Sequence, residues 1–230
     1  MRVAVLMPAL NEEAALPAIL DAMPEGVERV IVADNGSTDR TAEVARSYGA
    51  EVVREDERGY GAACLAGIQH LAQVGPPPDV LVFIDADGSD DPADIVRVVG
   101  PIERGEADFV LGVRRGAEGD VGTILPHARL GNRIVLGLTR LLFNESFEDL
   151  PPFRAIRFDR LLDLEMDDRN WGWTLQMQIR ALRSDLRVVE MDVSHHRRTE
   201  GVSKISGSLS MSLRVGAKMF YTLARERMRG

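Results

Sequence analysis

The first half of the chain alternates short apolar runs with segments of helical periodicity, and this alternation limits the fold more than any other sequence feature. It is typical of a parallel sheet whose strands are joined by crossover helices. The predicted strands of this half are residues 3–7, 29–33, 51–54, 80–84 and 109–112. The fourth is apolar and rich in β-branched residues, as in strands buried on both faces. We therefore expect an α/β domain with a mostly parallel, Rossmann-like sheet.

Helices are predicted between these strands and through most of the second half. The predicted helices are 12–21, 38–48, 61–74, 92–99, 129–143, 158–164, 171–182 and 209–228, with a further strand at 187–193 and loops at 114–126 and 148–154. Ser37 or Thr38 is expected to cap the second helix, and Gly49 to end it. Asp167 and Asp168 are expected to form a solvated turn. Because no stretch is composed like a flexible linker, one domain is predicted.

Four polar clusters follow the predicted strands. They are Asn11-Glu12, residues 34–39, residues 58–61 and Asp85-Ala86-Asp87. In open parallel sheets, ligands bind outside the carboxyl ends of the strands. Each cluster alone is a weak signal, but their convergence on one edge of the sheet predicts a ligand site there.

Asp85 and Asp87 stand two residues apart at the end of the fourth strand. One carboxylate can meet a ribose while the other meets a divalent ion. Mg²⁺ or Mn²⁺ suits carboxylate and phosphate oxygens, and is commonly held by one or two carboxylates plus the phosphates of a substrate. The alternative is a polar turn in which Asp90 or Asp91 caps a helix that begins at Pro92. That alternative accounts for Asp90 and Asp91, but it accounts less well for two acidic residues, Asp85 and Asp87, directly after an apolar strand.

The charge distribution restricts the partners of the chain. A formal charge of −8 disfavours a general nucleic-acid binder. Residues 197–230 carry a net charge of +6, so the rest of the chain carries −14, which suggests an anionic partner near the C-terminus. Cys64 is the only cysteine, so no intrachain disulfide is possible and a reducing cytosol fits. No apolar stretch approaches the ~20 residues needed to cross a bilayer, so a cytoplasmic protein is expected.

Six segments together resemble a known family. They read Pro-Ala-Leu-Asn-Glu-Glu (8–13), Val-Ala-Asp-Asn-Gly-Ser-Thr-Asp (32–39), Gly-Tyr-Gly-Ala-Ala (59–63), Asp-Ala-Asp-Gly-Ser (85–89), Asp-Leu-Pro-Pro-Phe-Arg (149–154) and Gly-Val-Ser-Lys (201–204). In this order they resemble the family 2 glycosyltransferases of GT-A fold, particularly the dolichyl-phosphate mannose and glucose synthase-like branch. The resemblance implies one GT-A domain with three parts. These are a nucleotide-sugar-binding half (1–112), an acceptor half (113–207) and a C-terminal basic amphipathic helix (208–230).

The resemblance also implies roles for individual residues. Those implied to bind the nucleotide sugar are Pro8, Asn11, Glu12, Asp34, Gly61, Asp85, Arg115, Arg198 and Lys204. The three basic residues of this set, or Arg114 in place of its neighbour, would neutralise the diphosphate. Asp87 would hold Mg²⁺ or Mn²⁺, with Asp85 beside it. Ser89 stands where dolichyl-phosphate mannose synthases have a glutamine in the metal shell.

The implied reaction is the inverting transfer of a hexose from a UDP- or GDP-sugar. The acceptor would be a polyprenyl phosphate or another lipid-linked or phosphorylated molecule. If the acceptor is a hydroxyl, a general base must take its proton, and Asp149 matches the acidic position of the family. If the acceptor is a phosphate, no base is required, and Asp149 would orient the acceptor or Arg154, the second candidate catalytic residue.

The chain departs from the family pattern at two positions. Pro151 stands where the branch usually has a glycine, and Gln176 stands where relatives often carry glutamate, which puts an acidic role there in doubt. His195 and His196 resemble a metal pair, but adjacent residues of an extended chain point apart. They are therefore expected to be loop histidines near the phosphates.

The helices predicted at 129–143 and 209–228 bear on location. The second mixes apolar residues with Arg214, Lys218 and Arg225, and basic interfacial helices of this kind bind anionic lipid. Peripheral contact with the inner face of the membrane is one expectation. Packing of both helices in the core, or in a homodimer interface, is the other.

Three other functions fit part of the pattern. The segment from Phe83 to Ser89 also fits the strand end of haloacid-dehalogenase-type phosphohydrolases, with Asp85 as nucleophile and Asp87 as acid/base. That strand normally opens the fold, whereas here about 80 residues with their own polar loops precede it. A nucleotidyltransferase would show a glycine-rich, basic loop after the first strand, where this chain has Asn11-Glu12-Glu13. A sugar-nucleotide-binding relative without catalysis is the third alternative.

Overall fold

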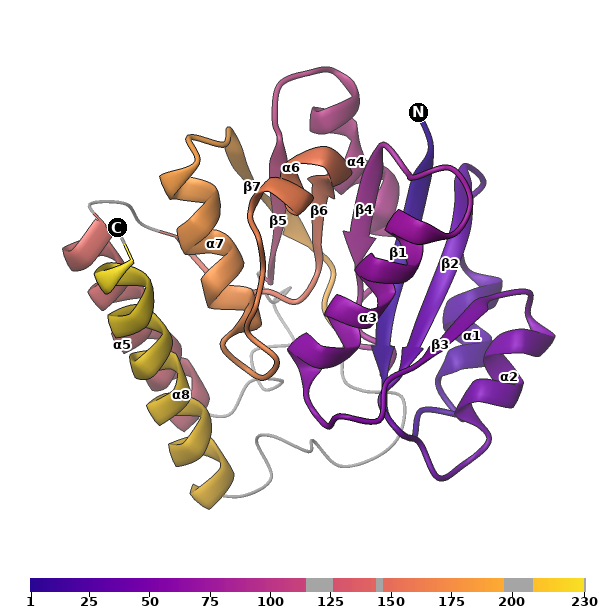
Figure 1. The fold of residues 1–230 in the computed structure, drawn as a ribbon, viewed down its shortest axis with the longest axis horizontal. Coiled ribbons are helices and arrows are strands. Elements are labelled where there is room, and N and C mark those ends of the chain that lie inside the picture. Colours follow the sequence, from indigo (N-terminus) through magenta and orange to yellow (C-terminus); the bar gives the residue numbers. More distant parts are fainter. Residues whose placement is uncertain (115–125, 144–146, 197–208, 230) are drawn as a thin grey trace.

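The computed structural model describes residues 1–114, 126–143, 147–196 and 209–229 (Figure 1). They form an α/β domain around one seven-stranded sheet in the order β3-β2-β1-β4-β6-β5-β7. The strands are β1 (Val3–Ala9), β2 (Val27–Asp34), β3 (Glu51–Arg54), β4 (Val80–Phe83), β5 (Phe109–Arg114), β6 (Arg154–Arg157) and β7 (Val188–Val193). All neighbours are parallel except β6, which runs antiparallel to both β4 and β5.

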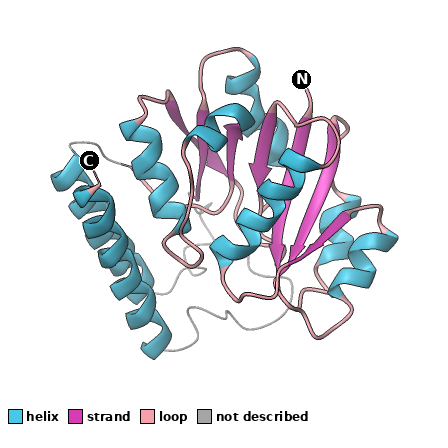
Figure 2. Cartoon of the chain, in the orientation of Figure 1, coloured by secondary structure: helices cyan, strands magenta, loops and turns pink. Residues whose placement is uncertain are grey.

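Helices cover both faces of this sheet (Figure 2). They are α1 (Leu16–Asp21), α2 (Thr41–Ser47), α3 (Tyr60–Gln73), α4 (Ile95–Glu103), α5 (Pro126–Phe143), α6 (Phe158–Asp163), α7 (Trp173–Arg183) and α8 (Leu209–Met228). Alternate strand residues point to opposite faces, so one core packs against α1, α2 and α4, and the other against α3, α6 and α7. Helices α5 and α8 pack outside α7, through Val135, Ile179 and Leu223.

The strands of the first half lie close to their predicted positions, and β6 is the main correction. Residues 148–154 were expected to be a loop that leads into a helix, yet Arg154–Arg157 forms a strand. The sequence Arg-Ala-Ile-Arg shows no apolar alternation of its own. The strand forms because both neighbours supply partners, with Arg154 opposite Phe83 on β4 and Leu111 on β5.

Two helix starts also differ from the prediction. Helix α1 begins at Leu16 rather than at residue 12, because Asn11 has a left-handed backbone (φ 54°) and turns the chain. Helix α2 begins at Thr41, and Ser37 and Thr38 bond to Asn11 instead of capping it. Gly49, with φ 81°, follows the end of α2 as expected.

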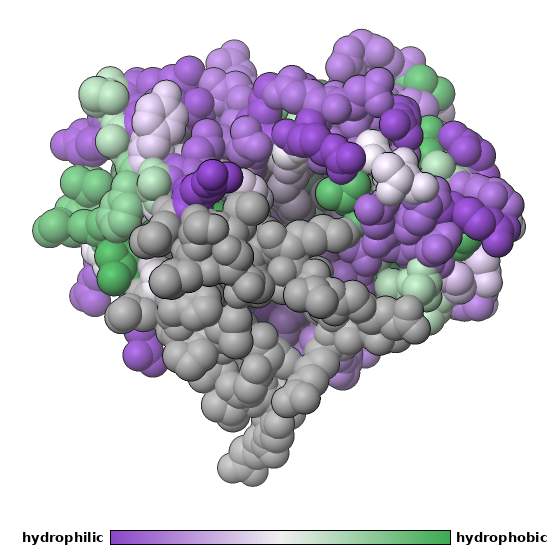
Figure 3. Space-filling model, turned by 90° about the horizontal axis from the view of Figure 1, so that it is seen from below, coloured by the Kyte–Doolittle hydropathy of each residue, from purple (hydrophilic) through white to green (hydrophobic). Residues whose placement is uncertain are grey.

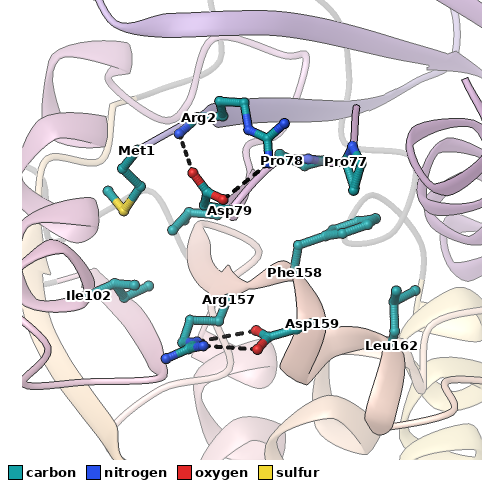
Figure 4. A pocket seen from close by; sticks show the side chains of 11 residues that line it. Met1, Arg2, Pro77, Pro78, Asp79, Ile102, Arg157, Phe158, Asp159 and Leu162 are labelled. Atoms are coloured by element: carbon teal, nitrogen blue, oxygen red, sulfur yellow. Dashed lines mark hydrogen bonds and ion pairs between the residues drawn. The ribbon is translucent and has the colours of Figure 1, made fainter. Parts of the chain in front are cut away.

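A cavity of about 390 Å³ opens at the amino ends of β1 and β4, at the end of the sheet opposite the polar clusters (Figure 4). Its rim carries two ion pairs, Arg2 with Asp79 and Arg157 with Asp159. Each of these side-chain charges is matched by its neighbour, so the cavity presents no unpaired charged side chain to a ligand. In the part of the chain that the structure describes, no helix combines the length and the apolar composition that a membrane span requires.

Candidate functional site

The predicted polar clusters meet at the carboxyl ends of four adjacent parallel strands. The register places Ala9 of β1 opposite Asp34 of β2, and Asp34 opposite Arg54 of β3. On the other side of β1, β4 ends at Phe83, next to Leu6. The loops that continue from these strands therefore share one edge of the sheet, as the sequence predicts.

Asn11 joins the first two loops to each other. Its backbone N–H donates to Ser37 Oγ at 2.9 Å, and its side-chain Oδ1 accepts from the Thr38 N–H at 2.8 Å. The Glu12 N–H donates to Thr41 Oγ1 at 2.8 Å. Pro8, also predicted to contact the donor, lies in β1 opposite Ala33. These bonds fix the backbone of the loops, whereas direct contact of Asn11, Glu12 and Pro8 with a nucleotide stays a prediction.

Asp34 and Asn35 form the floor of this edge, and both are buried. Asp34 accepts from the Ser37 N–H at 2.8 Å and from Arg54 at 3.2 Å. The Asn35 amide donates to the carbonyls of Glu55 and Glu57 and accepts from the Gly59 N–H at 2.8 Å. Asn35 is not among the residues predicted to bind the nucleotide sugar. The sequence signal for its role is its position in the Asp-Asn-Gly turn. An Asn that is buried there needs hydrogen-bond partners for both its side-chain oxygen and its side-chain nitrogen, so it ties neighbouring loops together.

The glycine-rich loop after β3 packs against a distant loop that precedes α7. A Cβ on Gly59 would lie 2.1 Å from the Arg169 carbonyl oxygen, and one on Gly61 would lie 2.0 Å from that of Asp168. The Ala62 N–H donates to the Arg169 carbonyl at 2.9 Å. Gly61 was predicted to bind the nucleotide sugar, and the structure shows a packing reason for a glycine at this position.

Gly61→Ala is accordingly expected to lower the free energy of unfolding by about 1–3 kcal/mol, the usual cost of an overpacked site. The clash is with backbone atoms on the opposite loop, which no side-chain rotation relieves. Gly137→Ala is the matched control, because a Cβ there meets nothing within 4 Å and Ala is the better helix former. Urea unfolding of both variants measures the difference, and a Gly61→Ala protein as stable as the wild type would contradict the packing argument.

The loop after β4 carries Asp85, Asp87 and Asp90. Asp87 is buried, and its Oδ1 accepts from the Ser89 N–H at 2.9 Å. Asp90 Oδ2 accepts from the Asp85 N–H at 3.2 Å. The cap of the following 3₁₀ turn, Pro92–Asp94, is Asp91, whose Oδ1 accepts from the Ala93 N–H at 2.9 Å. The capping interpretation therefore holds for Asp91 and does not involve Asp85 or Asp87.

The loop after β7 crosses the loop after β4. Asp90 and His195 form a β-bridge, and the His196 N–H donates to the Ser89 carbonyl at 2.8 Å. Asp90 Oδ1 and His195 Nδ1 lie 3.5 Å apart, and both are buried without a hydrogen-bond partner. The two histidines thus lie at the same edge as the acids. The sequence carried no signal for the Asp90–His195 contact, because it joins residues more than a hundred positions apart.

The residues of this edge fit a divalent ion that is shared with a substrate. Within the described ranges, no group of three His, Cys, Asp or Glu side chains could hold a metal by itself. Mg²⁺ is typically held by one or two carboxylates plus substrate phosphates and water. Asp85 and Asp87 supply that number of carboxylates, and the buried atoms Asp90 Oδ1 and His195 Nδ1, which have no hydrogen-bond partner, lie in the loops after β4 and β7.

Asp149, the predicted base, forms a bidentate ion pair with Arg114. The guanidinium Nε lies 2.7 Å from Oδ2, and Nη2 lies 2.8 Å from Oδ1. The Leu150 N–H also donates to Oδ1 at 2.8 Å. Burial acts to raise the pKa of Asp149, but the hydrogen bonds and charge of Arg114 outweigh it and lower that pKa. A carboxylate held in this way binds a proton weakly, which is unfavourable for a general base.

Arg154, the second predicted catalytic residue, lies inside the domain. Its side chain is buried, and its guanidinium donates to the carbonyls of Thr174 and Pro151 and lies 5.8 Å from the centre of the Phe109 ring. Burial lowers the pKa of Arg154 to about 10. These contacts tie β6 to the start of α7. Contact of Arg154 with a substrate stays a prediction.

The expectation of a solvated turn at Asp167 and Asp168 is wrong for Asp168, which is buried and pairs with Lys218 of α8 at 2.8 Å. Gln176, fully buried, accepts from the N–H groups of both aspartates and donates to Glu226 of α8 at 2.8 Å. This cluster of Asp167, Asp168, Gln176, Lys218 and Glu226 is called the α7–α8 polar cluster below. Its contacts give the glutamine at 176 a structural role.

Arg115, Arg198 and Lys204, the predicted diphosphate ligands, lie outside the described residues. The described residues nevertheless bring the four predicted polar clusters to one edge of the sheet, with the acidic loop after β4 next to the loop after β1. A family model described as Glycosyl transferase family 2 matches residues 4–164. The chain belongs to glycosyl transferase family 2. The predicted family is thereby confirmed.

Relatives of this family 2 glycosyltransferase extend over nearly the whole chain. An uncharacterized glycosyltransferase of Mycobacterium tuberculosis is 43% identical over 92% of this chain and 93% of its own length. The undecaprenyl-phosphate mannosyltransferase of Micrococcus luteus is 31% identical, over 91% and 89%. The crystal structure of glucosyl-3-phosphoglycerate synthase from Mycobacterium tuberculosis with Mn²⁺, UDP-glucose and phosphoglyceric acid superposes with a TM-score of 0.74 at 25% identity, over 98% of this chain and 79% of that one. The predicted GT-A fold is confirmed, and the chain is a transferase.

Proposed function

We propose that this enzyme is a metal-dependent, inverting hexosyltransferase that uses a UDP- or GDP-sugar and a polyprenyl phosphate acceptor. The observation that carries the proposal is the meeting of the Asp34–Asn35 turn, the glycine-rich loop and the Asp85–Asp87 loop at one sheet edge. The solved neighbour binds UDP-glucose and Mn²⁺, and the mannosyltransferase of Micrococcus luteus is named for a polyprenyl phosphate. Family membership argues against the phosphohydrolase and nucleotidyltransferase alternatives.

In the proposed reaction, the buried floor formed by Asp34 and Asn35 orients the nucleoside, and Asp87 and Asp85 are the residues that would hold Mg²⁺ or Mn²⁺. The bound ion supplies positive charge that stabilises the leaving diphosphate. The acceptor oxygen attacks the anomeric carbon from the face opposite the bond to the nucleotide. That bond breaks, and its electron pair leaves on the nucleoside diphosphate.

The Arg114–Asp149 ion pair supports a phosphate acceptor over a hydroxyl. An acceptor phosphate is already ionised at neutral pH, so no proton has to be removed before attack. A hydroxyl acceptor would require a base, and both oxygens of the candidate are bound by Arg114. We assign Asp149 to the positioning of Arg114, which precedes the predicted phosphate ligand Arg115 in the sequence.

The test is a donor and acceptor screen with the purified enzyme. With Mn²⁺ present, one UDP- or GDP-sugar at about 100 times its Kd is expected to stabilise the fold by about 2.7 kcal/mol, a rise in Tm of roughly 5–10 °C. The same donor is then incubated with polyprenyl phosphate, and the product is detected by mass. Stabilisation by a sugar nucleotide without transfer to any acceptor would support the inactive relative, and stabilisation by inorganic phosphate alone would overturn the proposal.

A further inference from the structure

Exposed apolar side chains are concentrated on α5 and α8. Eleven large apolar residues are exposed in the described part of the chain, and six of them belong to these two helices. They are Ile134, Leu141, Leu142, Phe220, Tyr221 and Met228. Leu141 is 78% exposed and Met228 is 81% exposed. In the view from below, apolar residues gather on the left side of the molecule, where α5 and α8 lie (Figure 3). A water-exposed apolar stripe of this kind marks an interaction surface.

Basic residues accompany the apolar ones with the same helical spacing. On α5, Ile134 and Leu141 lie seven residues apart, on one side of the helix, and Arg133 and Arg140 repeat the spacing one position earlier. On α8 the same interval separates Tyr221 from Met228, and Arg227 from Phe220. Arg133 and Arg140 of α5, with Arg214 and Arg227 of α8, are exposed and have no ion-pair partner among the described residues.

The inner sides of both helices are already satisfied, so the outer stripe is not a core face without a partner. On α8, Leu223 packs with the apolar residues of α5 and α7, and Glu226 is bound by Arg180 at 3.0 Å and by Gln176 at 2.8 Å. On α5, Val135 and Thr139 are buried. Both helices therefore present the outer stripe in the folded protein, and binding through it needs no unfolding.

We infer that the outer faces of α5 and α8 bind an anionic lipid bilayer. Apolar side chains flanked by arginines that pair with no carboxylate of the described ranges suit the boundary between acyl chains and anionic headgroups. Tyr221, with Lys218 5.3 Å above its ring, has the amphipathic character of interfacial aromatics. The chain outside residues 197–230 carries a net charge of −14, although α5 within it is basic. The remaining surface is therefore acidic and repels an anionic bilayer, so charge complementarity also favours this orientation. This inference rests on the proposed function only in that a bilayer would contain the polyprenyl phosphate.

The experiment is co-sedimentation of the full chain with vesicles. We expect binding to phosphatidylcholine vesicles that contain about one-third phosphatidylglycerol, weaker binding as salt rises, and little binding to phosphatidylcholine alone. Leu141→Glu combined with Tyr221→Glu should lower the bound fraction at least tenfold, and Arg133→Gln combined with Arg140→Gln should lower it several-fold.

The controls place the same substitutions elsewhere. Val96→Glu replaces an apolar residue that is 62% exposed on α4, and Arg46→Gln with Arg160→Gln removes two exposed arginines from α2 and α6. Both controls should bind vesicles like the wild type, and every variant compared must keep the wild-type Tm.

Two outcomes overturn the inference. One is vesicle binding that the surface variants leave unchanged, or no binding at all. The other is a lipid-free dimer, measured by analytical ultracentrifugation, that the Leu141→Glu and Tyr221→Glu pair dissociates without changing vesicle binding. The vesicle experiment contains no sugar nucleotide, so its result does not depend on transferase activity. A chain that binds vesicles but transfers no sugar would refute the proposed function and would still support the lipid-binding surface.

Discussion

Asp87→Asn is expected to lower the rate of sugar transfer about 10³-fold and to remove the effect of Mn²⁺ on nucleotide binding. Electrostatic groups that stabilise a transition-state charge are worth 10²–10³ in rate each, and Asp87 is the proposed anchor of the ion that neutralises the leaving diphosphate. The substitution keeps the size of a buried side chain and its hydrogen bond from the Ser89 N–H. Calorimetric titration with UDP or GDP, with and without Mn²⁺, separates lost metal binding from misfolding.

Asp91→Asn is the matched control for this variant. Asp91 lies in the same loop and caps the 3₁₀ turn at Pro92, and Asn is an equally good cap. This control should keep both transfer and the Mn²⁺ dependence of nucleotide binding. An Asp87→Asn enzyme that still binds nucleotide more tightly with Mn²⁺ would rule out Asp87 as the metal ligand.

Arg114→Gln is expected to destabilise the fold by about 3–5 kcal/mol, because it leaves the charge of Asp149 without its partner in a largely buried position. Arg114→Gln combined with Asp149→Asn should recover part of the loss, since the uncompensated charge is gone. Asp149→Asn alone should retain nucleotide binding. Its effect on the transfer rate distinguishes a general base from a residue that positions Arg114. If Asp149 only positions Arg114, transfer to a phosphate acceptor should fall far less than the loss of a general base would cause.

The same pair predicts a pH dependence of stability. The folded pKa of Asp149 is lowered, below an unfolded value of about 3.9. Its contribution to stability is therefore complete above the unfolded pKa and is lost as the pH falls through the folded pKa. Urea unfolding at several pH values should show the deficit of Arg114→Gln at neutral pH and a smaller one in acid. A deficit that is constant down to acidic pH would show that the ion pair is not its source.

The sequence predicts well that the polar loops share one edge of the sheet, because the residues that determine each loop are close together in the sequence. Strands β1 to β4 are short apolar runs, and each ligand loop follows its own strand directly, so strand prediction also places Asp34 and Asp87. Strand β6 could not be predicted from the sequence, because its stability comes from pairing with β4 and β5 rather than from its own residues. The same reason applies to two other contacts that could not be predicted, the Asp90–His195 bridge and the hydrogen bond between Gln176 and Glu226. Each of them joins residues that are far apart in the sequence.

The α7–α8 polar cluster has a consequence for the order in which the protein matures. Lys218 and Glu226 hold Asp168 and Gln176, and the neighbouring Arg169 carbonyl accepts from the Ala62 N–H beside the glycine-rich loop. The polar clusters of the candidate site belong to the first half of the chain, yet the loop that packs against the glycine-rich segment is held in part by the last helix. Because α8 is the last helix to leave the ribosome during synthesis, we expect a nascent chain without α8 to bind nucleotide more weakly than the released protein.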